Sequence, residues 1–378
     1  MIISITNAAA ETGIVAYGLL AILLVSVRRA RNSELFSMEI TNELKGLAIL
    51  MIVFSHIGYF LVNDNKFLVP FSNYAGVGVD LFLVLSGYGL VASALSRPLS
   101  IGRFYLRRLP RIYVPVIATL VIFLLLDFFA LGITYPLATT LQNFVGIFGR
   151  ANLYEHIDSP LWYITFILIN YLLFPLIFRR RFPFLSAVAM AGAMWLTVVY
   201  LPSINLISLD LLSFYKLHFF AFPLGMAICA LLNRPHQLIP TFIGKLNGGV
   251  YRSQIFMILR LTAFVLAAAI LIYNYRHGQV GKAWYWETAA SLANVVGLLL
   301  IFILKKIDFR SLSLLGAFSF EIYLLHWPLL WRYNFLFGRL PAGSATLIYL
   351  ILFILAGFLF KKLNNKILNA AGFCKITK

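Results

Sequence analysis

Lys45 and His56 stand eleven residues apart in the apolar stretch 43–62, and an ammonium and an imidazole suit anion binding and acid–base chemistry. If the stretch is helical, a rotation of about 100° per residue puts both side chains on one face, about 16 Å apart. Ionisable side chains in a membrane helix are costly and usually face a protein interior or a wet cavity. The pair therefore predicts the two ends of one elongated site.

Asp80 lies in the next apolar stretch, and we expect it at the depth of His56 on a neighbouring antiparallel helix. There its carboxylate would set the tautomer of the imidazole and strengthen it as a general base. Two alternatives remain open. His56 can bond to a backbone carbonyl in the core, and Asp80 can cap the start of its own helix, where the dipole favours a carboxylate. Of the nearby glycines, two of Gly76, Gly78 and Gly87 are expected to allow close helix packing.

The densest group of cations follows this second stretch and consists of Arg97, Arg103, Arg107, Arg108 and Arg111. Arg108 and Arg111 are three residues apart, so they project from one side if the helix has already begun there. Guanidinium groups together with the Lys45 ammonium would suit a polyphosphate ligand. For any single arginine, binding of anionic lipid is the alternative.

The composition predicts an all-α polytopic membrane protein, because 61% of the 378 residues are hydrophobic and only 12% are charged. A soluble chain with a net charge of +18 would suggest nucleic-acid binding, but here most cations lie in loops on one side. We therefore expect no nucleic-acid partner. Eleven membrane helices are predicted, at residues 14–27, 46–62, 77–95, 112–133, 161–178, 184–200, 217–232, 255–273, 288–304, 314–333 and 345–360.

The positions of lysine and arginine predict an N-terminus outside and a C-terminus inside. In that orientation the inner segments hold 23 of these cations and the outer segments hold seven. We expect an extra helix and basic linker at residues 1–37, one membrane domain at 38–360 and a basic cytoplasmic tail at 361–378.

Five short motifs in this order resemble landmarks of the integral-membrane acyltransferase-3 family. They are Lys45-Gly46 with His56, Gly78–Phe82 with Ser86–Tyr88, Arg107–Tyr113, Pro160–Tyr163 and Ser319–Pro328. The resemblance covers nearly the whole chain. Two features depart from the family pattern: Lys45 replaces the usual arginine, and the first helix lies outside the usual ten-helix core.

The resemblance implies that an acyl group, commonly acetyl, moves from cytoplasmic acyl-CoA to a hydroxyl of a cell-envelope polysaccharide or glycolipid. It also implies a multi-pass protein of the inner (plasma) membrane whose partners are the bilayer, acyl-CoA and a carbohydrate acceptor. The donor phosphates would rest on Lys45, Arg107, Arg108 and Arg111. His56 would act as general base with Asp80 holding its ring, and no metal is expected.

A second set of candidates would contact the acceptor and comprises Trp162, Tyr163, Glu321, Tyr323 and His326. The Trp162-Tyr163 pair could stack on sugar rings, but an interfacial aromatic belt is the leading alternative explanation for it. Glu321 and His326 are five residues apart, so they do not share a helix face closely, and Glu321 would pair with an arginine.

Two other functions fit the same residues. A transporter or flippase of envelope intermediates would use His56, Asp80 and Glu321 as a proton relay. A non-catalytic scaffold in envelope assembly would not need His56 at all. The loop residues Glu155, His156 and Asp158 are expected to be solvated, because their spacing fits no known set of metal ligands.

Overall fold

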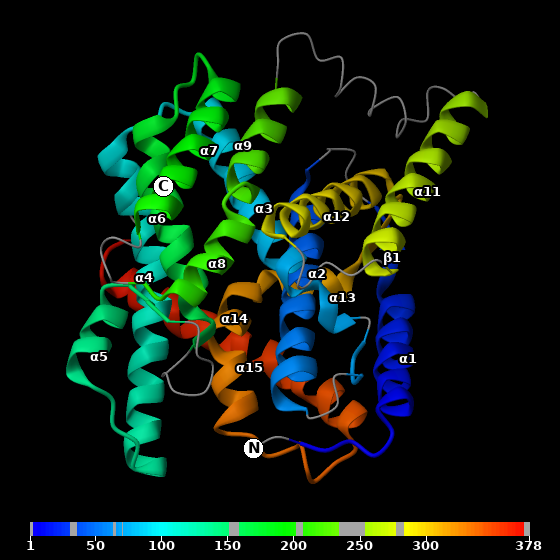
Figure 1. Cartoon of the computed structure of the whole chain (residues 1–378), viewed down its shortest axis with the longest axis vertical. Helices are drawn as coiled ribbons and strands as arrows, with labels where there is room; N and C mark the ends of the chain where they lie inside the picture. The colour runs from blue at the N-terminus through cyan, green and yellow to red at the C-terminus, as the bar shows by residue number, and fades with distance from the viewer. Residues whose placement is uncertain are drawn as a thin grey trace.

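The computed structural model describes residues 3–30, 36–62, 66–69, 71–150, 159–201, 207–233, 254–276 and 283–373. In this part the chain is almost entirely helical (Figure 1). The α-helices are α1 (Ala8–Ser26), α2 (Met38–Ser55), α3 (Ala75–Ser96), α4 (Ile101–Leu126), α5 (Leu137–Phe144), α6 (Trp162–Ile177), α7 (Pro183–Tyr200), α8 (Leu209–His218), α9 (Ala221–Leu232), α11 (Gln254–Arg276), α12 (Trp284–Leu304), α13 (Arg310–Ala317), α14 (Ser319–Trp331) and α15 (Ala342–Ala370).

Short elements complete the described chain. Two π-helical segments, η1 (His56–Leu61) and η3 (Asp127–Leu131), extend α2 and α4, and the 3₁₀ turns are η2 (Phe71–Tyr74) and η4 (Ser159–Leu161). The strands β1 (Val27–Arg29) and β2 (Ile307–Phe309) form a two-stranded antiparallel sheet.

The expectation of an all-α polytopic membrane protein is confirmed. Among the described residues, nine helices are long and apolar enough to cross a membrane, and the bent pair α13–α14 would make a tenth. α6 is apolar too but has only 16 residues. Each of the eleven predicted stretches thus coincides with a helix or a helix pair. The last prediction was too short, because α15 continues to Ala370 through much of the predicted tail.

Glycines allow the central helices to meet backbone to backbone. A Cβ atom placed on Gly46 of α2 would lie 2.0 Å from the carbonyl oxygen of Leu312, and one on Gly316 would lie 1.7 Å from that of Asn42. α2 and α13 are therefore held together where no side chain fits between them.

The prediction of close packing for two of the three glycines near Asp80 is confirmed for Gly78 and Gly87. A Cβ on Gly78 would lie 2.7 Å from the Ala48 carbonyl oxygen of α2, and one on Gly87 would lie 2.2 Å from the Phe222 carbonyl oxygen of α9. Gly76 differs from both, because its Cβ would meet only the imidazole of His218.

The tenth predicted helix is broken. α13 and α14 meet at Phe318 with a bend of 76° between them. α13 packs along the first half of α2, whereas α14 reaches its far end. This broken pair therefore contacts α2 at two levels.

The first helix is attached to the rest of the molecule at both ends. At one end, the backbone N–H of Ile3 donates, over 2.8 Å, to the carbonyl of Leu61, which is the last residue of the π-helical turn η1. At the other end, β1 pairs with β2, and Ser26 and Ser311 are hydrogen-bonded at 2.8 Å. α1 is thus an integral part of this fold, although it lies at its edge (Figure 1).

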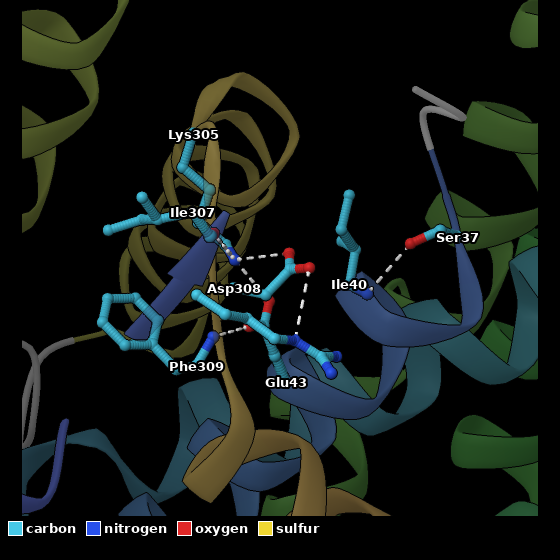
Figure 2. A network of polar contacts seen from close by, with 8 residues as sticks. Ser37, Ile40, Glu43, Lys305, Ile307, Asp308 and Phe309 are labelled. Atoms are coloured by element: carbon cyan, nitrogen blue, oxygen red, sulfur yellow. Dashed lines mark hydrogen bonds and ion pairs between the residues drawn. The ribbon is translucent and has the colours of Figure 1, made fainter. Parts of the chain in front are cut away.

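A polar network lies beside this small sheet, and it centres on the fully buried Glu43 of α2. Figure 2 shows Lys305 and the backbone N–H of Phe309 turned toward the Glu43 carboxylate, to which both donate. Asp308 lies 3.7 Å from the Lys305 ammonium and 3.8 Å from Nε of Arg28. The network joins β1, α2 and the segment before α13 at the Lys45 end of α2.

Candidate active site

His56 and His326 form a direct pair, which the sequence did not lead us to expect. Nδ1 of His56 lies 2.7 Å from Nε2 of His326, and the two rings are nearly parallel, with 5° between their planes. His56 is the first residue of the π-helical turn η1, and His326 lies in the middle of α14. π-helical turns inside α-helices are frequent at functional sites.

The hydrogen bonds of this pair define the tautomer of each ring. Nδ1 of His326 lies 2.8 Å from the Tyr323 carbonyl oxygen and 3.1 Å from that of Ile322. Because a carbonyl only accepts, this nitrogen carries the proton, and a neutral ring must then accept at Nε2. A charged His326 is disfavoured because the ring is fully buried and no carboxylate is bonded to it among the described residues.

It follows that His56 donates its Nδ1–H to His326 and keeps a lone pair on Nε2. Within the part of the chain that the structure describes, Nε2 of His56 has no hydrogen-bond partner, and the residue is only half-buried. An unprotonated imidazole nitrogen that is held in place and accessible can accept a proton from a substrate. Both ring nitrogens of His326 thus have protein partners, and its predicted contact with the acceptor stays a prediction.

The predicted pairing of Asp80 with His56 is wrong. Asp80 is fully buried in the second turn of α3, and its two carboxylate oxygens bind Nδ1 of His218 at 2.7 Å and the Ser291 hydroxyl at 2.5 Å. The reason is the register of α3 on α2. Gly78 contacts the stretch Ala48–Ile52, one to two turns before His56, so Asp80 is neither level with His56 nor at a helix cap.

Aromatic rings connect the two histidine positions. Trp162 stacks on His218 with 5.8 Å between ring centroids, Tyr163 follows at 6.3 Å, Tyr323 lies 5.6 Å from Tyr163, and His326 lies 6.1 Å from Tyr323. We call Trp162, Tyr163 and Tyr323 the aromatic bridge. The Tyr323 hydroxyl donates to the Pro160 carbonyl, which ties α14 to the start of α6.

Cations gather at the other end of α2. Arg108 and Lys361 lie close enough to Lys45 for their positive charges to repel it. Lys361 comes from α15; its ammonium donates to the Ala317 carbonyl at 2.6 Å and acts on the nearby Glu321 carboxylate. A group of like charges in an apolar helix bundle is stabilised by a bound anion.

The structure places the other residues predicted to bind the acyl donor, or to pair with them, less clearly beside Lys45. Arg107 is half-buried and has contacts of its own, whereas Arg111 is exposed. Glu321, which we expected to pair with an arginine, instead lies in the first turn of α14 beside Lys361. Of the predicted cations, the structure thus brings Lys45 and Arg108 together.

A separate cluster of polar side chains surrounds Asp127 in η3. The fully buried carboxylate accepts hydrogen bonds from Tyr135 at 2.6 Å, from Tyr333 at 2.7 Å and from Arg332. Burial and the hydrogen bond to Asp127 raise the pKa of Tyr135 far above its usual range, so the phenol remains a donor. Because the Asp127 carboxylate is hydrogen-bonded by three donors, this cluster joins α4 to the end of α14 and has a structural role.

Three residues of these sites escaped the sequence analysis: His218, Ser291 and Lys361. His218 lies in the predicted seventh helix, so its ionisable side chain was a usable signal. The described residues contain no group of three or more histidine, cysteine or acidic side chains placed to hold a metal ion. The loop residues Glu155, His156 and Asp158 lie outside the described residues.

The helices and the hydrogen-bonded histidine pair define a multi-pass membrane protein with the components of an acid–base site. A family model described as an acyltransferase domain matches residues 42–362, and the chain belongs to that family. It is therefore an acyltransferase, which needs an acyl donor and an acceptor. A search of the curated proteins found no match to the chain, and neither did a search of the solved structures.

Proposed function

We propose that the protein transfers an acyl group, acetyl in the commonest case, from cytoplasmic acyl-CoA to a hydroxyl of a cell-envelope polysaccharide or glycolipid. The inner (plasma) membrane would be its location. The observation that carries the proposal is Nε2 of the half-buried His56, whose lone pair is defined by the hydrogen bond of Nδ1 to His326. Membership of the acyltransferase family supports the reaction class.

The donor would lie along α2. Its phosphates would bind near Lys45 and Arg108, where the positive charges repel one another. Arg107 and Arg111 precede and follow Arg108 on α4 and would extend this surface. Lys45 and His56 are about 16 Å apart along a helix, so an extended pantetheine arm could carry the thioester from one to the other.

At the thioester, Nε2 of His56 would take the proton of the acceptor hydroxyl while the oxygen attacks the carbonyl carbon. The tetrahedral intermediate would then collapse with cleavage of the carbon–sulfur bond. The coenzyme A thiolate would leave and take the proton back from His56, so that the base is regenerated. His326 would hold the ring throughout, and Trp162, Tyr163 and Tyr323 would face the acceptor sugar.

The transporter alternative is less well supported. A proton relay needs groups within hydrogen-bonding reach, but among the described residues no hydrogen bond links His56, Asp80 and Glu321. His56 is bonded to His326 and Asp80 to His218, whereas Glu321 lies within the electrostatic influence of Lys361.

The proposal is tested by transfer of labelled acetyl from acetyl-CoA to envelope glycan with purified protein in vesicles. His56→Ala removes the base and should lower the rate about 10²–10⁴-fold, with unchanged insertion and thermal midpoint. A matched control is Gly89→Ala, because a Cβ at Gly89 meets no atom within 4 Å. Wild-type turnover in His56→Ala would contradict the assignment, and glycan transport without acetylation would favour the transporter.

A further inference from the structure

One buried polar group has no part in the proposed reaction. It is formed by His218, Asp80 and Ser291, and we call it the His218 site. His218 is 4% exposed and Asp80 is fully buried. The three residues come from α8, α3 and α12. An ionisable pair in a membrane helix bundle is costly, which favours a functional role over a purely structural one.

One ring nitrogen of His218 is hydrogen-bonded to the protein and the other is not, among the described residues. Both oxygens of Asp80 accept hydrogen bonds, from His218 at 2.7 Å and from Ser291 at 2.5 Å, so Nδ1 of His218 carries a proton. Among the described residues, Nε2 of His218 has no hydrogen-bond partner. Nε2 is an acceptor if the ring is neutral and a donor if it is charged. A hydroxyl group can satisfy it in either state.

Gly76 of α3 lies beside the edge of this imidazole at an ordinary contact distance. A Cβ atom built on Gly76 would have only one neighbour within 4 Å among the described residues, Cε1 of His218, at 3.6 Å. Gly78 and Gly87 on the same helix are, by contrast, pressed against backbone atoms. A methyl group at position 76 would therefore fit beside the carbon that separates Nδ1 from Nε2.

The aromatic bridge begins at His218 and ends at His326, the partner of His56. A glycan of several sugars carries hydroxyls around a row of apolar ring faces, and ring-to-ring steps of 5.6–6.3 Å lead from His218 to His326. Two polar positions joined by aromatic rings match that chemistry, because aromatic side chains pack on the apolar face and hydroxyls bind at both ends.

We propose that the His218 site binds a hydroxyl of the carbohydrate acceptor through Nε2 of His218, while a second hydroxyl is presented to His56. This inference rests on the proposed function for the identity of the acceptor. Asp80 and Ser291 are positioning residues that orient the imidazole. The site anchors the acceptor and selects which of its hydroxyls reaches the thioester.

His218→Asn is the sharpest test, because the asparagine amide can donate to Asp80 in place of Nδ1–H but has no counterpart of Nε2. Transfer of labelled acetyl is measured while the amount of extracted envelope glycan is varied. We expect the apparent KM for glycan to rise at least about tenfold, with unchanged KM for acetyl-CoA and unchanged thermal midpoint. An unchanged KM for glycan overturns the inference, as does a rise confined to the KM for acetyl-CoA.

A second variant covers the case in which His218→Asn fails to fold. Gly76→Ala places a methyl group beside the imidazole without touching the Asp80 hydrogen bond, and Gly89→Ala on the same helix is its control. Gly76→Ala should raise the KM for glycan and Gly89→Ala should not. Equal values for these two variants would overturn the inference.

A binding measurement separates this inference from the proposed function. Extracted envelope glycan should raise the thermal midpoint of the wild-type protein and of His56→Ala, but not that of His218→Asn. If wild-type protein transfers no acetyl yet shows this difference, the proposed function fails and the carbohydrate site stands. If glycan shifts no midpoint in the wild type, the His218 site is not a carbohydrate site.

Discussion

At the scale of single residues, the molecule uses two imidazoles in two different settings. His56 is bonded to a neutral ring, His326, whereas His218 is bonded to a carboxylate, Asp80. A carboxylate partner stabilises a charged imidazole, and a neutral partner does not. His56 is therefore suited to taking up a proton briefly during a reaction, and His218 to holding a ligand.

His326 is expected to act by positioning His56. His326→Ala removes the acceptor of the His56 Nδ1–H and should reduce kcat about tenfold, equivalent to about 1.4 kcal/mol. His326→Gln should restore part of the rate, because its side-chain oxygen can accept the same hydrogen bond. Measurement of kcat and of the KM for acetyl-CoA checks this. A purely structural role predicts no advantage of glutamine over alanine.

Arg108 and Arg111 provide a matched pair for the donor site. Arg108 lies near Lys45, whereas Arg111 is exposed on the same helix. A charge-assisted hydrogen bond contributes about 1.5–3 kcal/mol, so Arg108→Glu should raise the KM for acetyl-CoA roughly tenfold or more. Arg111→Glu should raise it less. Equal increases of the KM for acetyl-CoA in the two variants, or no increase in either, would show that the donor phosphates bind elsewhere.

At the scale of elements, the broken helix α13–α14 determines how the histidine pair forms. α13 is pressed onto α2 through Gly46 and Gly316, and the 76° bend then directs α14 so that His326 meets His56. The position of His326 therefore depends on a contact at the opposite end of α2.

Gly316→Ala should weaken this arrangement. Its Cβ would lie 1.7 Å from the Asn42 carbonyl oxygen, and because that atom belongs to the backbone, a helix must move. We expect a loss of stability of at least about 1–3 kcal/mol, seen as a lower thermal midpoint in detergent and lower activity. Gly102→Ala, where no atom lies within 4 Å, is the control and should not lower the midpoint.

The hydrophobic pattern predicted the helices well but not their relative positions. Long apolar runs identify spans directly, and each predicted span has a counterpart. The partner of Asp80 was missed because we assumed that sequential helices are level, whereas the Gly78 contact shifts α3 along α2. The break at Phe318 was missed because no proline, the usual signal for a sharp kink, stands between Arg310 and Trp327.

At the scale of the whole molecule, the first helix lies outside the family match at residues 42–362 but is joined to the matched region at both ends. Its buried surface is small, since only 11% of its span is buried. Backbone pairing and polar contacts at both ends add to its packing against α15, where Gly18 lies against Leu347. The Glu43 network (Figure 2) lies where these contacts meet.

Removal of residues 1–36 should therefore lower stability without preventing insertion. The shortened chain keeps Ser37, whose hydroxyl caps α2 by accepting from the Ile40 N–H at 3.2 Å. We expect a lower thermal midpoint that co-expressed residues 1–36 partly restore. An unchanged midpoint would show that α1 is only loosely associated with the domain.

The π-helical turn at His56–Leu61 determines how the residues beyond it are rotated about the axis of α2. It accommodates a wider turn between the imidazole and the Leu61 carbonyl to which Ile3 bonds. If one residue were deleted from this turn, everything beyond it would rotate by about 100° and shift by about 1.5 Å. The imidazole contact and the attachment of the N-terminal segment could then not both be kept, so the length of this turn is constrained from both sides.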